Sequence, residues 1–377
     1  AAGAQPILDD AVTVATKTVT NDDRIVSAQV GVRIEHPRVS DLVLTLISPR
    51  GTRVLLAELK ALSPDAALAA AKICAFMAEA GWPWAEAVAA ALPANAAAGG
   101  LDVWRRLPEW NETAPRPAPE SVTVSEAEAR ERLRSLLGSR AEARPQQSDY
   151  AALAAATFLP RDQAGVPHVV LAEAGTGIGK TLGYIAPASL WTEKSGGTVW
   201  LSTYTKNLQR QIDQELDRLY PDPAQKARKV VVRKGRENYL CLLNAEEAVG
   251  AARPADKVAL ALIVRWAEAS RDGDMTGGDF PAWLVELQGA RRTVALTDRR
   301  GECIYSACPH YRRCFIERGI RRARRADIVI ANHALVMIQA ALTTEAGAAE
   351  ARDLPVRYVF DEGHHLFDAA DSAFSAH

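Results

Sequence analysis

The stretch "AEAGTGIGKT", residues 172–181, decides the fold because it joins a strand-like run to a helix-like one. Its glycines let successive backbone N–H groups curl around a phosphate, and the helix starting at Lys180 points its positive dipole end at the anion. We expect Lys180 to reach the β- and γ-phosphates of a nucleotide and Thr181 to bind Mg²⁺. The residues of the loop pattern, with alanine in place of the usual first glycine, are Ala174, Gly175, Thr176, Gly177, Gly179, Lys180 and Thr181. A chance match in a glycine-rich loop is the alternative, but the order of strand, loop and helix opposes it.

A second stretch, "YVFDEGHH" at residues 358–365, supplies the complementary half of a nucleotide site. A hydrophobic strand ends there in Asp361 and Glu362, and ligands of parallel α/β sheets gather at the carboxyl ends of strands. Asp361 is expected to hold Mg²⁺ and Glu362 to orient or deprotonate the attacking water. Two acids after a strand are also common at a plain helix N-terminus. The phosphate loop upstream favours the nucleotide interpretation, with Lys180, Asp361 and Glu362 as catalytic residues.

From about residue 144 onward, apolar strand-like runs alternate with helical stretches, which predicts an α/β fold with a parallel sheet. The predicted strands lie in "HVVLAEAG" (168–175), "TVWLSTYT" (198–205), "KVVVRKG" (229–235), "ADIVIANH" (326–333) and "VRYVFDEGHH" (356–365).

The residues before 144 have a different character. Residues 1–58 are strand-like and predict a short all-β piece, including "RIVSAQVGVRI" and "DLVLTLISPRGTRVLL". Residues 59–143 read as a helical segment and linker: Ser63-Pro64 starts a helix, and residues 108–122 are rich in proline. Ser125 and Glu128 have the spacing of a capping box.

Composition excludes several classes of protein. The 45 basic and 46 acidic residues balance, so any nucleic-acid surface must be a local patch. No apolar run approaches the ~20 residues that span a bilayer, and no basic-then-apolar leader is seen. We therefore expect a cytoplasmic protein without a membrane partner.

The five cysteines are unevenly placed. Cys74 stands alone in an alanine-rich stretch and reads as a small buried apolar residue. Three others fall within "CIYSACPHYRRC" (303–314). In a long chain without a signal peptide, such clustering points first to metal ligation. The four candidate ligands are Cys241, Cys303, Cys308 and Cys314, with 61, four and five residues between them.

From about residue 60 to the end, the chain resembles the iron–sulfur superfamily-two DNA helicases, the XPD/DinG group, and within it the DinG-like branch. "EAGTGIGKT" resembles motif I, "STYTKNLQRQI" (202–212) motif Ia, and "DEGHH" the DEAH box with Gly363 in place of alanine. "RPQQ" (144–147) is similar to the adenine-reading element, with Gln147 as its candidate residue. "GRENYLC" and "IANHALV" also match stretches of these helicases.

The resemblance implies a RecA-like first motor domain over residues 144–377, carrying an iron–sulfur insertion at about 235–325. It implies that the four cysteines hold a 4Fe–4S cluster, for which four thiolates are needed. A zinc site is the rival, although the spacing lacks paired C-x2-C knuckles.

The resemblance also implies a monomeric motor that moves 5′ to 3′ on single-stranded or forked DNA in repair or replication, with ATP and Mg²⁺ as cofactors. A basic stretch with interleaved aromatic residues follows the cysteines and suits phosphates and unpaired bases; a solvated helix face is the plainer interpretation. The candidate DNA contacts are Thr203, Thr205, Lys206, Asn207, Arg312 and Arg313. His364 is expected to couple the nucleotide state to the DNA side, whereas His333 could equally be a packed or capping residue.

Two departures from the family matter. The second motor domain would follow His377, so we expect this chain alone to turn ATP over poorly and not to unwind DNA. Residues 5–58 instead resemble the front half of a P domain, the β-sandwich attached to proprotein convertases, on "DL" (41–42) and "SPRGT" (48–52). A natural fusion and an artefact of gene prediction both remain open. The alternative functions are a protease-associated protein without catalysis and a redox-sensing DNA-dependent ATPase.

Overall fold

The computed structural model describes residues 42–47, 53–59, 64–83, 85–86, 101–112, 114, 116–139, 142, 144–160, 166–299, 301–346 and 357–375. Contacts divide the chain into two compact units, residues 1–78 with 83–98, and residues 79–82 with 99–377. The second unit thus includes the segment before residue 144 from Gly99 onward. The predicted strand at 24–34 and the turn "SPRGT" lie outside the described residues.

The first unit contains an antiparallel strand pair and a helix. Strands β1 (Leu42–Ile47) and β2 (Arg53–Leu59) pair with Leu42 opposite Leu59, and the register shifts between Leu44 and Thr45. Helix α1 (Pro64–Glu79) begins at the predicted proline.

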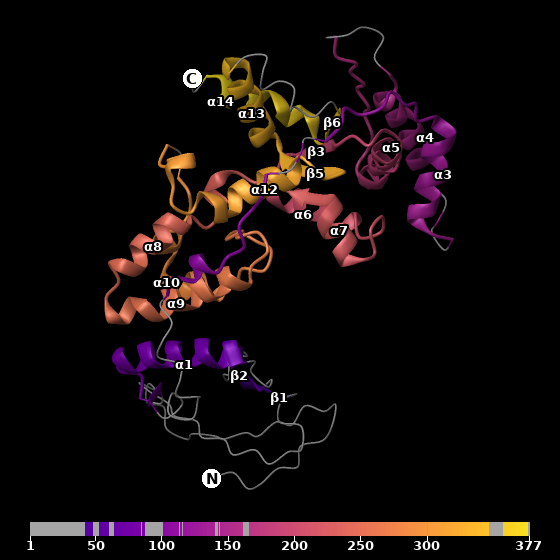
Figure 1. Cartoon of the computed structure of the whole chain (residues 1–377). Coiled ribbons are helices and arrows are strands. Elements are labelled where there is room, and N and C mark those ends of the chain that lie inside the picture. The colour runs from indigo at the N-terminus through magenta and orange to yellow at the C-terminus, as the bar shows by residue number, and fades with distance from the viewer. Residues whose placement is uncertain are drawn as a thin grey trace, which may run out of the picture. The chain divides into compact units, whose positions relative to one another are not determined.

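A parallel four-stranded sheet in the order β4-β5-β3-β6 forms the centre of the second unit (Figure 1). Its strands are β3 (Val199–Thr203), β4 (Val230–Val232), β5 (Ile328–Asn332) and β6 (Arg357–Phe360). All three pairings are parallel, as the alternating pattern predicts.

Both faces of the sheet are covered because both sets of alternating side chains are apolar. Leu201 and Ile330 point into one core, with helices from the N-terminal side of the unit. Trp200 and Val329 point into the other core. The helices around the sheet are α3 (Glu126–Leu137), α4 (Pro145–Ala155), α5 (Lys180–Ser195), α6 (Lys206–Glu215), α7 (Pro223–Lys229), α12 (Phe315–Ala323), α13 (His333–Ala346) and α14 (Leu366–Phe374).

Helix α3 begins and ends at the residues that its sequence predicts. Ser125 caps it, the Glu128 carboxylate accepts from the Ser125 amide, and Gly138 ends it with a φ of 79°. This confirms the predicted capping box.

One predicted strand is not formed. Residues 166–175, which include "HVVLAEAG", belong to no described helix or strand, and Val169 and Leu171 are 70% and 91% exposed. Strand propensity largely expresses packing against neighbouring strands. Val169 and Leu171 are apolar, but they are exposed and do not pack against a neighbouring strand. The segment therefore does not join the sheet.

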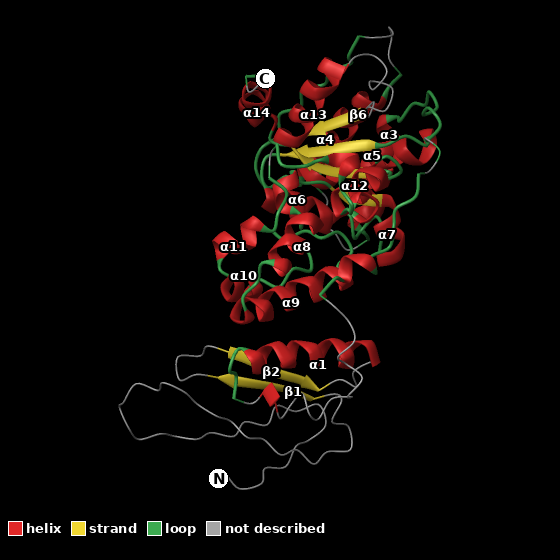
Figure 2. Ribbon diagram, turned by 60° about the vertical axis from the view of Figure 1, so that its left-hand side comes forward, coloured by secondary structure: helices red, strands yellow, loops and turns green. Residues whose placement is uncertain are grey.

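A mostly helical lobe lies beside the sheet between β4 and β5 in sequence (Figure 2). Leu240, Ile263 and Phe315 are buried in its own core, which also takes in Val103 and Trp104 from the segment before α3. Its helices are α8 (Leu242–Gly250), α9 (Pro254–Ala269), α10 (Trp283–Gln288) and α11 (Ala290–Ala295). We call it the cysteine lobe, because all four clustered cysteines lie in it.

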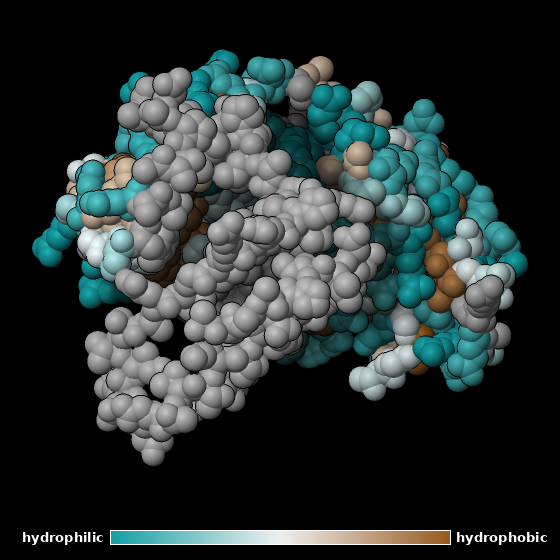
Figure 3. Space-filling model, turned by 90° about the horizontal axis from the view of Figure 1, so that it is seen from below, coloured by the Kyte–Doolittle hydropathy of each residue, from teal (hydrophilic) through white to brown (hydrophobic). Residues whose placement is uncertain are grey.

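Where described residues are visible in Figure 3, hydrophilic side chains predominate and hydrophobic ones form small separate patches. Among the described residues, no helix combines the length and the apolar character needed to cross a bilayer.

Candidate functional site

Residues at the start of helix α4 form hydrogen bonds to the phosphate loop. The side-chain amide of Gln147 donates a 2.9 Å hydrogen bond to the Gly179 carbonyl, and Arg144 donates to the Gly177 carbonyl at 3.4 Å. Gly179 has a φ of 86°, and a Cβ there would lie 2.1 Å from the Gln147 amide nitrogen. A side chain here would be strained by the left-handed backbone and would displace the Gln147 amide.

Gln147 contacts the phosphate loop in this structure. It is 3% exposed and binds the loop itself, so its amide is not presented to a base here. The role of Gln147 in reading adenine stays a prediction.

The predicted catalytic residues meet at the carboxyl edge of the sheet. The Lys180 ammonium lies 3.3 Å from a carboxylate oxygen of Glu362, although 182 positions separate them in sequence. The Asp361 amide donates to the Ser202 carbonyl at 2.8 Å, which continues the pairing of β6 with β3. The loop and the acidic turn thus face one another across the site.

Glu362 has an unusual backbone. Its φ of 58° and ψ of 45° are left-handed, and Tyr305 is the other non-glycine residue with positive φ in the described part of the chain. Such a conformation costs about 1–2 kcal/mol for a residue with a Cβ. Strained residues of this kind cluster at functional sites, because the surrounding structure must enforce them.

The electrostatics at Asp361 suit a cation site. Burial raises the pKa of the Asp361 carboxyl, the neighbouring Glu362 carboxylate raises it further, and Lys180 lowers it. The fully buried Tyr184 hydroxyl lies beside Asp361 and Thr181 without a hydrogen bond of ordinary geometry. The Asp361 carboxylate and the Thr181 hydroxyl are hard oxygen donors of the kind that Mg²⁺ prefers.

A buried histidine lies under this turn. His333 is 1% exposed, its Nδ1 lies 2.8 Å from the Ser202 hydroxyl, and its ring centroid is 5.8 Å from that of Phe360. Burial lowers the pKa of His333, so the imidazole is neutral. The burial of His333 and its contact with Ser202 favour a packed residue. His364 is exposed and lies 3.7 Å from the Glu362 carboxylate.

The motif Ia residues divide into buried and exposed groups. Thr203 is fully buried, so its hydroxyl does not face solvent, and Thr205 uses its hydroxyl to cap helix α6. Lys206 and Asn207 are exposed. Tyr204, which the sequence did not single out, stacks on His365 of the acidic turn with centroids 3.8 Å apart. This contact joins the motif Ia loop directly to the nucleotide side.

Two arginines of the predicted basic patch form ion pairs with glutamates of this chain. Arg313 pairs with Glu109 at 2.6 Å, and Arg321 pairs with Glu112 at 2.8 Å. Trp110 anchors this segment: its indole donates to the Tyr311 carbonyl, and the Arg321 guanidinium lies 3.2 Å from its ring centroid. Arg312 is exposed. The aromatic and acidic residues of "LPEWNE" (107–112) were the signal that could have revealed this contact.

The four clustered cysteines are free thiols in the cysteine lobe. Cys241 and Cys314 occupy the positions just before helices α8 and α12. Arg236 donates to the Cys303 sulfur at 2.9 Å, and the Tyr305 amide approaches it at 3.4 Å. Backbone amides also point at the other three sulfurs. Such donors favour thiolate ligands at cluster sites.

Three of these thiols are nonetheless protonated at neutral pH. Burial raises the pKa of Cys241 and Cys308, and it raises the pKa of Cys314 to about 11. Within the described ranges, no three His, Cys, Asp or Glu side chains are gathered closely enough to hold a metal ion. The donor chemistry therefore fits a thiolate-bound cluster, but the structure does not assemble the four sulfurs into one ligand set.

Two parts of the chain are similar to known proteins. Residues 25–86 match the family of proprotein convertase P-domains. The ATP-dependent DNA helicase YoaA of Escherichia coli is 33% identical over 221 residues, which cover 56% of this chain and 32% of the relative. The ATP-dependent helicase DinG of Mycobacterium tuberculosis is 34% identical over 232 residues, covering 55% and 33% respectively.

The 3′–5′ exonuclease DinG of Bacillus subtilis is also similar, at 30% identity over 217 residues that cover 53% of this chain and 20% of that protein. The chain thus spans a third or less of the length of these relatives. Over more than half of its own length, this chain is similar to curated proteins named DinG and YoaA, as the sequence motifs predict.

Proposed function

We propose that residues 144–377 are the ATP-binding motor portion of an ATP-dependent DNA helicase. The observation that carries this proposal is the approach of Lys180 on the phosphate loop to Glu362 on the acidic turn, at 3.3 Å. The similarity to proteins named as ATP-dependent helicases supports it.

The geometry suggests how this chain's residues act on ATP. Without a nucleotide, Glu362 is the partner of the Lys180 ammonium. A γ-phosphate would draw Lys180 to itself and release the Glu362 carboxylate, which could then orient the attacking water. Asp361 and Thr181 would hold Mg²⁺, which shields the phosphate charge when bound.

On the DNA side, we propose that the exposed Lys206 and Asn207 contact the phosphate chain of a single strand, with Arg312 contributing from the cysteine lobe. The Tyr204–His365 stack offers a route by which the nucleotide state reaches this loop. Movement from 5′ to 3′, a monomeric motor, forked substrates and a cytoplasmic location rest on the resemblance alone.

We further propose that Cys241, Cys303, Cys308 and Cys314 hold a 4Fe–4S cluster. The amide and guanidinium donors at the sulfurs support this. Thiol protons must leave before the ligands bind. Anaerobically purified chain should contain about four iron atoms, the number in a cubane cluster; a stoichiometric zinc content would favour the rival site.

Nucleotide-dependent DNA binding tests the motor function directly. Fluorescence anisotropy of a labelled oligo-dT should give different affinities with and without a non-hydrolysable ATP analogue and Mg²⁺. The variant Tyr204→Ala should bind the analogue normally but lose this difference. Identical DNA affinities in both states of the natural chain would count against a nucleotide-driven motor.

The match of residues 25–86 to P-domains supports a second proposal for the N-terminal piece alone. We propose that it is a partial P-domain-like module with no catalysis of its own. Limited proteolysis tests this, because a folded module should survive as a fragment ending near residue 98, the limit of the first compact unit.

A further inference from the structure

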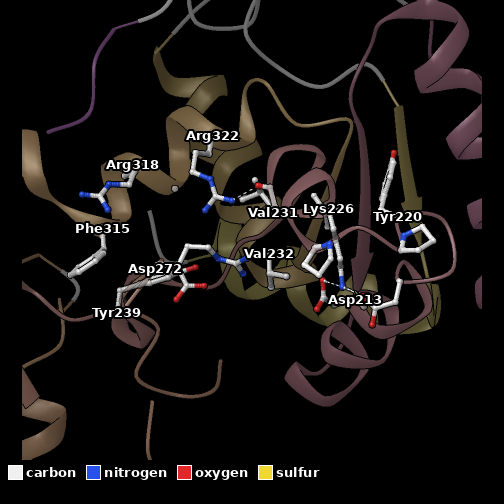
Figure 4. Close-up of a pocket in the computed structure, with 17 residues that line it drawn as sticks. Asp213, Tyr220, Lys226, Val231, Val232, Tyr239, Asp272, Phe315, Arg318 and Arg322 are labelled. Atoms are coloured by element: carbon white, nitrogen blue, oxygen red, sulfur yellow. Dashed lines mark hydrogen bonds and ion pairs between the residues drawn. The ribbon is translucent and has the colours of Figure 1, made fainter. Parts of the chain in front are cut away.

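A pocket of about 430 Å³ lies between the sheet edge at β4 and the cysteine lobe (Figure 4). One wall carries Arg318 and Arg322 of helix α12, and Lys226 of α7 and Asp213 of α6 lie on the other. Arg271 also lines the pocket. Val231, Val232 and Phe315 line it with apolar surface. The pocket is separate from the phosphate loop, none of whose residues lines it.

Three arginines line this pocket. Arg318 and Arg322 are four residues apart on helix α12 and so share a face. Their guanidinium groups are tethered by carbonyls: Arg322 donates to Ala227 at 2.7 Å, and Arg318 donates to Pro108 at 2.6 Å. Among the described residues, neither these two nor Arg271 forms an ion pair with a carboxylate. Their remaining N–H donors are available to a ligand.

The carboxylates around the pocket do not balance these charges. Asp213 and Asp217 both pair with Lys226, at 3.0 and 2.7 Å. Asp272 is the remaining acidic side chain of the lining. Burial raises the pKa of the Asp272 carboxyl, whereas a hydrogen bond from the Asp274 amide and the charge of Arg271 lower it. The lining thus holds three arginines and one carboxylate that is not paired with Lys226.

The burial of the arginines makes an anion favourable here. Burial lowers the pKa of both Arg318 and Arg322, and the nearby Arg271 charge lowers that of Arg322 further. Guanidinium groups stay protonated in proteins, so they repel one another until an anion joins them. Arginine's planar fork matches phosphate oxygens in bidentate geometry.

We propose that this pocket binds the phosphate group of a phosphate ester, with Arg271, Arg318 and Arg322 as its donors. The phosphate can come from a nucleic-acid strand or from a free nucleotide or polyphosphate. In either case the site is distinct from the phosphate loop and does not depend on it.

The test uses the full chain with Lys180→Ala, which removes the phosphate-loop lysine. Titration calorimetry at low salt with inorganic pyrophosphate should show saturable binding. Adding Arg271→Gln and Arg322→Gln should weaken it by at least about tenfold, since each charge-assisted hydrogen bond contributes more than that factor requires. The matched control is Arg324→Gln with Arg325→Gln, which removes the same charge from exposed positions near the end of α12 and should leave binding unchanged.

A second variant distinguishes loss of the binding site from loss of the folded structure. Gly319 lines the pocket, and a Cβ there would meet nothing within 4 Å. Gly319→Glu should place a carboxylate against the arginines and block pyrophosphate while all three remain. If an oligo-dT displaces pyrophosphate, the ligand is a strand; if only mononucleotides do, it is a free ester. Absence of pyrophosphate binding, or equal binding by the Arg271→Gln/Arg322→Gln chain, would overturn the proposal.

Discussion

The left-handed backbone of Glu362 leads to a prediction in which glycine is more stable than alanine. Glu362→Ala removes the ion pair to Lys180 and keeps the strain, because alanine still has a Cβ at a φ of 58°. Glu362→Gly removes the same ion pair and the strain together. Relief of about 1–2 kcal/mol of strain is offset in part by the greater freedom of glycine in the unfolded chain, which costs about 0.4–1 kcal/mol. The glycine variant should therefore be more stable by roughly 0.5–1 kcal/mol.

Urea unfolding of both variants measures this difference, with Asp371 as the control position. Asp371 is exposed within helix α14, where glycine should be the less stable replacement by about 0.5–1 kcal/mol. The order of alanine and glycine should thus invert between the two positions. If Glu362→Gly is the less stable of its pair, Glu362 does not hold a left-handed conformation and the argument about strain at the acidic turn fails.

Three further changes test other parts of the site. Gln147→Ala should lower the free energy of unfolding by about 0.5–1.5 kcal/mol, because it removes the Gln147 hydrogen bond while the Gly183 amide still donates to the Gly179 carbonyl; no measurable loss in urea would show that the loop does not depend on Gln147. Asp361→Asn should stabilise the nucleotide-free chain at pH 7, since the fold disfavours the ionised carboxylate. This gain exists above the raised pKa and should disappear as pH falls to the ordinary aspartate value of 3.8; a pH-independent effect would contradict it. Trp110→Ala should lower the free energy of unfolding by about 3–5 kcal/mol, as expected for a buried tryptophan. Trp110→Phe should lower it by less, because phenylalanine keeps part of the packing. Equal stability of the two variants in thermal unfolding would refute the anchoring role.

The sequence was most informative where chemistry and local geometry coincide. Gly177 and Gly179 have the positive φ that the phosphate loop requires, and the run ending in Asp361 forms the expected parallel strand. Both features are local, so residue types and spacing suffice to predict them.

Non-local packing could not be read in the same way. The pairing of Glu109 and Glu112 with Arg313 and Arg321 joins residues about two hundred positions apart. No periodicity specifies which carboxylate meets which arginine, so the arginines read only as a basic patch. The strand predicted around Leu171 is wrong because its residue types were judged without a pairing partner. Its residues favour a strand, but a strand also needs a neighbour to pair with.

The phosphate loop and the acidic turn are proposed to form a single nucleotide site. Equilibrium titration of the chain with a fluorescent ATP analogue and Mg²⁺ tests it, comparing Lys180→Ala with the control Lys194→Ala at the far end of the same helix. We predict saturable binding that Lys180→Ala abolishes, that Lys194→Ala preserves, and that weakens when Mg²⁺ is chelated. Binding of equal strength in the Lys180→Ala chain would contradict the claim.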